Sequence, residues 1–101
     1  MSDVTGSIGL GDGFSLAYDL NPSTTNPELT LKLEWEGAEF ASATLTESDT
    51  SATFGGKVPD SGGLEAEATT SFNFQTNVLT YSVVVDSPIS KKKTYSGSKT
   101  L

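Results

Sequence analysis

Residues 11–37 read GDGFSLAYDLNPSTTNPELTLKLEWEG, and apolar side chains recur at every second position on both sides of a break. Alternation with a period of two is typical of β-strands that bury one face. The two Asn-Pro pairs in the break disfavour helix and interrupt strand pairing, so they indicate a surface loop. The two apolar rows are Phe14, Leu16, Tyr18 and Leu20, then Leu29, Leu31, Leu33 and Trp35.

The same alternation continues along the chain, and no segment has a convincing helical period. Turn-forming residues separate the apolar rows, among them GDG at 11–13, PDSGG at 59–63 and QTN at 75–77. The pattern predicts about eight strands, at residues 4–10, 14–20, 28–35, 39–46, 52–58, 64–74, 78–86 and 92–101.

A chain of 101 residues predicts a single all-β domain spanning residues 1–101. Short connections favour antiparallel neighbours in a meander, so we expect an up-and-down barrel or a barrel-like sandwich. These two architectures are slightly favoured, since closure would remove exposed strand edges. A Greek-key sandwich remains open.

The fourth predicted strand allows two orientations. Either Ala41, Ala43 and Leu45 point inward, or Phe40 does so together with hydroxyl-bearing neighbours. The first orientation is favoured because it buries no hydroxyl groups. It places Phe40 outside the core or at its rim.

The charge and composition exclude several function classes. The formal net charge is −7, and all six basic residues are lysines. An acidic field repels phosphate backbones, so nucleic acid is not an expected partner, and surplus charge favours a soluble protein. The chain has no cysteine and therefore no disulfide. Its first residues do not resemble a signal peptide, no stretch is long enough for a membrane span, and nothing indicates a compartment.

No catalytic residue is assigned. Without His or Cys, the usual general base and the strongest nucleophile are missing. Glu34 and Glu36 share the face opposite an apolar row, so we expect them to be solvated. No metal site or cofactor is expected, because turn carboxylates such as Asp12 and Asp60 do not form a dense calcium-binding run.

The aromatic residues are the candidate ligand-binding residues. Trp35 continues an apolar row, which favours the core, although its place at a strand end allows a rim platform for a sugar together with Phe40. Small residues on the inward rows either let side chains interdigitate or leave a pocket. That pocket would be lined by Tyr18, Phe54, Phe72 and Tyr81.

The sequence therefore predicts a non-catalytic binding or protein-interaction module. One alternative is a barrel that encloses an apolar small molecule as a carrier or template, and another is a structural or self-assembling subunit. The partner is a protein, a glycan or an apolar small molecule, and a homo-oligomer is possible. The chain lacks the Gly-x-Trp start of lipocalins and the tryptophan pattern of avidins.

Overall fold

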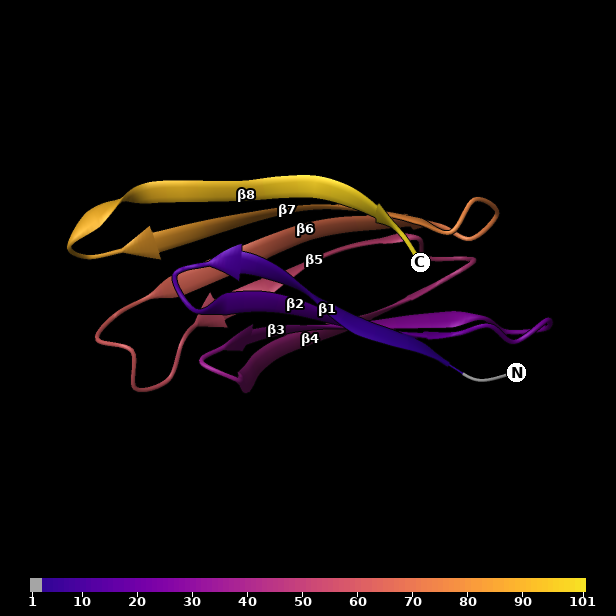
Figure 1. Cartoon of the computed structure of the whole chain (residues 1–101), viewed down its shortest axis with the longest axis horizontal. Helices are drawn as coiled ribbons and strands as arrows, with labels where there is room; N and C mark the ends of the chain where they lie inside the picture. The colour runs from indigo at the N-terminus through magenta and orange to yellow at the C-terminus, as the bar shows by residue number, and fades with distance from the viewer. Residues whose placement is uncertain (1–2) are drawn as a thin grey trace.

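Two antiparallel four-stranded sheets make up the protein (Figure 1). The structure is a computed structural model that describes residues 3–101, except the side chain of Ser90. Met1 and Ser2, which begin the segment considered above for a signal peptide, lie outside this description. The first sheet contains β1 (Val4–Gly11), β2 (Phe14–Asn21), β3 (Glu28–Trp35) and β4 (Ala38–Thr46). The second sheet contains β5 (Ser51–Lys57), β6 (Glu65–Asn73), β7 (Val78–Ser87) and β8 (Ser90–Thr100).

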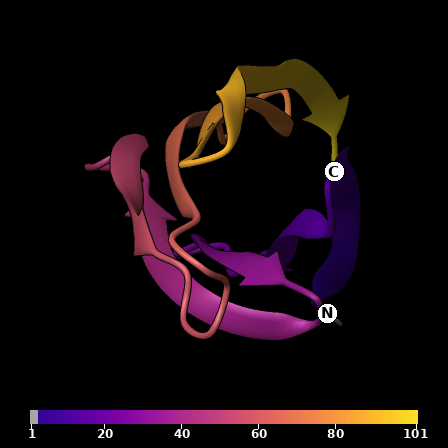
Figure 2. The same ribbon diagram turned by 90° about the vertical axis from the view of Figure 1, so that its left-hand side faces the viewer.

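Within each sheet the strands pair in chain order, as expected for a meander. The end-on view shows the two sheets facing each other, with β1 and the end of β8 on the same side (Figure 2). Across the described residues, strand pairing joins neither β4 to β5 nor β8 to β1, so the sheets do not close into a barrel. The predicted all-β antiparallel fold with eight strands is confirmed, whereas barrel closure is not observed.

Two hairpins of the first sheet have two-residue turns. Asp12 and Gly13 have φ angles of 53° and 86°, and Glu36 and Gly37 have φ angles of 52° and 84°. Positive φ at both central residues is the signature of a type I′ turn, whose twist matches that of the flanking strands. Such short turns hold the register of the strands that they connect.

The predicted apolar rows form one core between the sheets. The first sheet supplies five leucines with no exposed surface, and the second sheet covers them with Phe72, Leu79, Val83 and Val85. The hydroxyl of Thr70 is also buried, and it donates a hydrogen bond to the carbonyl oxygen of Ala52 at 3.0 Å. The five leucines are Leu16, Leu29, Leu31, Leu33 and Leu45.

The fourth strand carries a bulge that the sequence pattern did not predict. Leu45 is buried and Ala41 is half-buried, as expected for the favoured orientation. Leu33 pairs with Ala41 but Glu34 pairs with Glu39, which leaves Phe40 as an extra residue. The Phe40 ring consequently turns toward the core, where it is half-buried and meets Phe14 edge-on at 6.0 Å between centroids. It therefore lies at the rim of the core, which is one of the two places expected for it, and not outside the core.

Each terminal strand has a glycine beneath a tyrosine ring. Gly6 in β1 pairs with Tyr18, and Gly97 in β8 pairs with Tyr81. A Cβ atom at Gly97 would lie 2.8 Å from the Tyr81 hydroxyl, and a Cβ atom at Gly6 would clash with the Tyr18 hydroxyl. A side chain at either position would displace the ring, so both tyrosines cover the backbone of an edge strand.

Across residues 3–101 the structure contains no helix of the length and hydropathy required to cross a membrane.

The core can be tested with the Leu31→Ala substitution. Leu31 is fully buried between Tyr18 and Ala43 on the neighbouring strands. Removing such a side chain leaves a cavity, so we expect a loss of about 2–5 kcal/mol in the free energy of unfolding. Urea denaturation followed by circular dichroism measures this loss. A change below about 0.5 kcal/mol, the range typical of surface positions, would contradict the shared core.

Candidate binding surface

The outer face of the second sheet carries a regular array of hydroxyl groups at its centre. Besides Thr94 and Thr100 in β8, each of the four strands presents at its centre two outward Ser or Thr side chains that are separated by one inward residue. We call these eight side chains the hydroxyl grid. The grid consists of Ser51 and Thr53 in β5, Thr69 and Ser71 in β6, Thr80 and Ser82 in β7, and Ser96 and Ser98 in β8.

The strand register aligns the eight side chains in two rows that cross the whole sheet. In one row Ser51 faces Ser71, Ser71 faces Thr80, and Thr80 faces Ser98. In the other row Thr53 faces Thr69, Thr69 faces Ser82, and Ser82 faces Ser96. The repeat is about 4.8 Å between strands and about 6.7 Å between alternate residues along a strand. The hydroxyls therefore repeat in two dimensions.

The grid faces the solvent. Seven of its eight residues are exposed, and Ser82 is half-buried. Within residues 3–101, no side-chain hydrogen bond to another protein group involves a grid hydroxyl. All eight except Thr53 line one shallow depression of about 620 Å³. The hydroxyls are therefore available to an external partner.

Charged side chains are confined to one end of this face. Beyond the grid, Glu65, Glu67, Asp86 and Lys92 line a second shallow depression of about 440 Å³. Gly55 also lines this hollow, and a Cβ atom at Gly55 would clash with the backbone of Ala66. The face is thus divided into an uncharged hydroxyl half and a charged half.

The outer face of the first sheet has a different character. Lys32 lies at its centre and forms an ion pair with Glu39 at 3.7 Å. Ser15 donates a hydrogen bond to Glu34 at 3.4 Å, so a hydroxyl on this face is already used by a carboxylate. Charges and hydroxyls are mixed here, which makes the uncharged grid particular to the second sheet.

The sequence contains a signal for the grid that composition and apolar alternation do not reveal. Hydroxyl residues flank one other residue in SAT at 51–53, TTS at 69–71, TYS at 80–82 and SGS at 96–98. At least one such triplet falls in each of four consecutive strands, and a meander pairs consecutive strands. In the first sheet such triplets occur only in the two outer strands, for example TGS at 5–7 and SAT at 42–44. The alignment of the triplets in the second sheet still depends on the register, which composition and alternation do not supply.

Two of the predicted site residues, Trp35 and Phe40, lie together at one end of the core. Both rings pack against Phe14, with centroid separations of 6.5 Å for Trp35 and 6.0 Å for Phe40. The indole nitrogen of Trp35 donates a hydrogen bond to the carbonyl oxygen of Asp12 at 3.1 Å. Both rings are half-buried, so they support the β1–β2 turn, and a role in sugar binding remains a prediction.

The other four predicted site residues all lie on inward rows. Phe72 is buried and meets Phe74 edge-on at 4.7 Å, and Phe54 is half-buried opposite Ala68. Tyr18 and Tyr81 cover glycines in β1 and β8. Neither depression described above is lined by more than one of these four rings. The structure therefore does not bring them together around either hollow.

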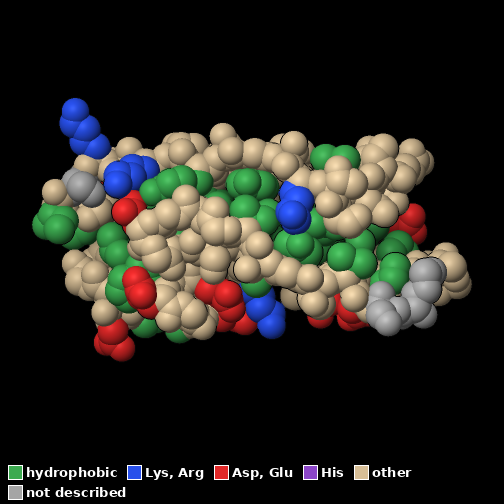
Figure 3. All heavy atoms as spheres, in the orientation of Figure 1, with side chains coloured by type: hydrophobic (Ala, Val, Ile, Leu, Met, Phe, Trp, Pro, Cys, Tyr) green, Lys and Arg blue, Asp and Glu red, His purple; other side chains and the backbone are tan. Residues whose placement is uncertain are grey.

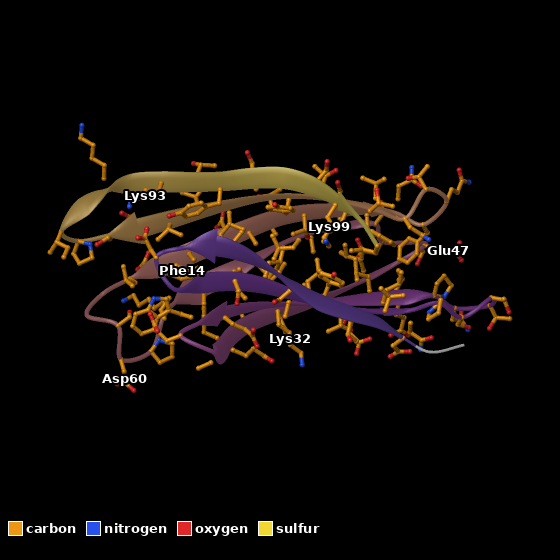
Figure 4. All side chains as sticks on the ribbon, in the orientation of Figure 1. Phe14, Lys32, Glu47, Asp60, Lys93 and Lys99 are labelled. Atoms are coloured by element: carbon orange, nitrogen blue, oxygen red, sulfur yellow. The ribbon has the colours of Figure 1, made fainter. Side chains whose placement is uncertain are left out.

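Asp12 connects the β1–β2 turn of the first sheet to β8 of the second sheet. Its carboxylate accepts hydrogen bonds from the Tyr95 hydroxyl at 2.8 Å and from the Lys93 ammonium group at 3.1 Å. Figure 4 shows Lys93 and Phe14 near the same end of the molecule. The hydrogen bonds from Tyr95 and then Lys93 lower the pKa of Asp12 below its usual value of 3.8, and hydrogen bonding to Asp12 raises the pKa of both partners.

In the part of the chain that the structure describes, no group of three or more carboxylates is placed to hold a metal ion.

Comparison with protein-family models, curated proteins and solved structures finds no match to this chain.

The contact of Asp12 with β8 predicts a dependence of stability on pH. A carboxylate whose pKa is lowered in the folded state stabilises that state above its unfolded pKa, and this contribution disappears as the pH falls through the folded pKa. We expect Asp12→Asn to lower the melting temperature at pH 7, by a small amount because the pair is exposed. The difference from the parent protein should begin to shrink as the pH falls below 3.8 and should vanish once the pH lies below the lowered pKa of Asp12 in the folded state.

Thermal denaturation followed by circular dichroism across an acid pH series measures both effects. Asp60→Asn, a change at another exposed turn carboxylate, is the matched control and should leave the melting temperature unchanged at pH 7. Equal melting temperatures for Asp12→Asn and the parent protein at pH 7 would show that the contact does not stabilise the fold.

Proposed function

We propose that the protein is a non-catalytic binding module that uses the hydroxyl grid as its binding surface. In this proposal the two sheets form an open, barrel-like sandwich that acts as a rigid support for the grid. The non-catalytic part of the proposal rests on the absence of His and Cys from the sequence. The binding part rests on the aligned, exposed and unpartnered hydroxyls.

The shape and chemistry of the grid favour an extended, uncharged partner. Each hydroxyl offers one donor and two acceptor positions, so the grid is suited to a surface rich in oxygen-bearing groups. It spans all four strands and lies in a shallow depression instead of a deep cleft. Small ligands are usually held in concave sites that bury most of their surface. A broad solid surface or a packed polymer is therefore the better match.

The alternative of a carrier for an apolar small molecule receives less support. The inward side chains of both sheets belong to one buried cluster. An enclosed ligand would have to displace leucines with no exposed surface, at the cost of the packing that these side chains now provide.

A second candidate function, a self-assembling subunit, is favoured by the terminal edge strands. Neither β1 nor β8 has a strand partner on its outer side within the described residues. A band of hydrophobic side chains is visible along the middle of the face shown in Figure 3, and Val4 at the start of β1 is 39 % exposed. Unpaired edges of this kind can accept a strand from another molecule.

Adsorption to uncharged solids tests the proposed function. We expect the protein to co-sediment with at least one of microcrystalline cellulose, chitin or ice, with little dependence on salt because the grid carries no charge. Thr80→Lys places a charge in the grid and should abolish adsorption. Thr44→Lys, at an exposed position on the outer face of the first sheet, should leave it intact. If the parent protein adsorbs to none of the three solids, the proposal is overturned.

Size-exclusion chromatography at low concentration tests the self-assembly alternative. A self-assembling subunit elutes as a defined oligomer that Val4→Lys dissociates and Thr44→Lys does not. A monomer at every concentration would rule this alternative out and would leave the adsorption result unaffected.

A further inference from the structure

We infer that the hydroxyl grid binds ice, that is, the ordered water lattice at the surface of an ice crystal. This inference rests on the proposed function and names the partner of the same surface. It draws on three properties of the described residues: the chemistry of the hydroxyls, their repeat in two dimensions, and the kinds of side chain missing from the grid.

The grid presents the same chemical group that a water lattice presents. A Ser or Thr hydroxyl donates one hydrogen bond and accepts up to two, so it can replace a water molecule at a lattice site. The eight hydroxyls are not committed to other protein groups within residues 3–101. Thr70 shows the contrast, because its inward hydroxyl is satisfied by the carbonyl oxygen of Ala52. Only the outward hydroxyls remain free to bind water.

The grid repeats in two directions, as a crystal surface does. Strand pairing repeats the hydroxyls at about 4.8 Å, and strand alternation repeats them at about 6.7 Å. Both repeats are held by backbone pairing through β6 and β7, the two central strands of the sheet. A single polymer chain would use a one-dimensional row of contacts, whereas a crystal face can engage both rows of the grid at once.

The side chains of the grid are also largely ordered before binding, so they lose little conformational entropy when a partner binds. Ser and Thr side chains are short, and Thr is further restricted at χ1 by its branched Cβ. The backbone beneath them is already ordered by pairing and by the core. A surface that is ordered before binding loses little freedom on binding, which favours an affinity built from many weak contacts.

The residue types missing from the grid argue against other partners. Protein interfaces are enriched in aromatic residues, Met and Arg, and their binding energy seldom comes from Ser or Thr. The depression that the grid lines contains one residue of the enriched types, Tyr81, and its other residues are Ser, Thr and Gly. It contains no lysine to contact phosphate, and the Tyr81 ring lies on an inward row against Gly97. Binding to ice through hydroxyl groups requires neither a charged side chain nor an aromatic ring.

Ice growth in the presence of the protein tests this inference. The melting and freezing temperatures of a single ice crystal are measured in a nanolitre droplet, and the crystal shape is imaged. We expect the parent protein to separate the two temperatures and to produce a faceted crystal. Thr69→Lys/Thr80→Lys, which changes two neighbouring strands of the grid, should lose both effects. Thr30→Lys/Thr44→Lys, which changes two paired strands of the first sheet, should retain them.

Circular dichroism must first show that both double variants are folded. If the grid variant does not fold, Ser98→Lys replaces it, because β8 is an edge strand and edge strands tolerate lysine. A folded parent protein that neither separates the two temperatures nor shapes the crystal would overturn the inference. Equal activity of the grid and control variants would also overturn it. Adsorption to cellulose or chitin without activity on ice would overturn the ice inference alone and would leave the proposed function standing.

Discussion

The strand register is the constraint on which the rest of the structure depends. In a β-strand, a shift of one residue moves every inward side chain to the outer face. The register of β6 and β7 buries Phe72 opposite Leu79, and by the same alignment it sets Ser71 opposite Thr80 on the outside. The same strand register therefore determines both the buried core and the hydroxyl grid. A change of register would alter both at once.

This coupling explains how a chain without His or Cys can carry an ordered surface. Burial of the leucine and valine rows fixes which side chains face outward, and backbone pairing fixes their spacing. The two-residue turns hold the register in the first sheet, and the contact of Asp12 with Lys93 and Tyr95 connects that sheet to β8. The first sheet and this contact support the second sheet, whose outer face is free for a partner.

Alternation alone was enough to predict the strands and most of the core, because burial of one face of a strand makes apolar residues recur at every second position. The first strand is the exception, since Val4 is 39 % exposed. The residues predicted inward in 28–35 and 78–86 are buried or half-buried in the structure. Alternation could not place Phe40, since a bulge changes the period locally. It also could not reveal the grid or the contact of Asp12 with Tyr95, 83 positions along the chain. Both depend on which strands meet and in what alignment, and short-range patterns do not encode that information.

The most direct test of this account is the register of β6 and β7 in solution. Nuclear Overhauser contacts between backbone protons of the two strands report which residues lie opposite one another. The account predicts cross-strand contacts of Ser71 with Thr80 and of Thr69 with Ser82. Contacts of Ser71 with Leu79 or Tyr81 as its direct partner would reveal a shift of one residue. Such a shift would misalign the two rows of hydroxyls and would expose core side chains to water.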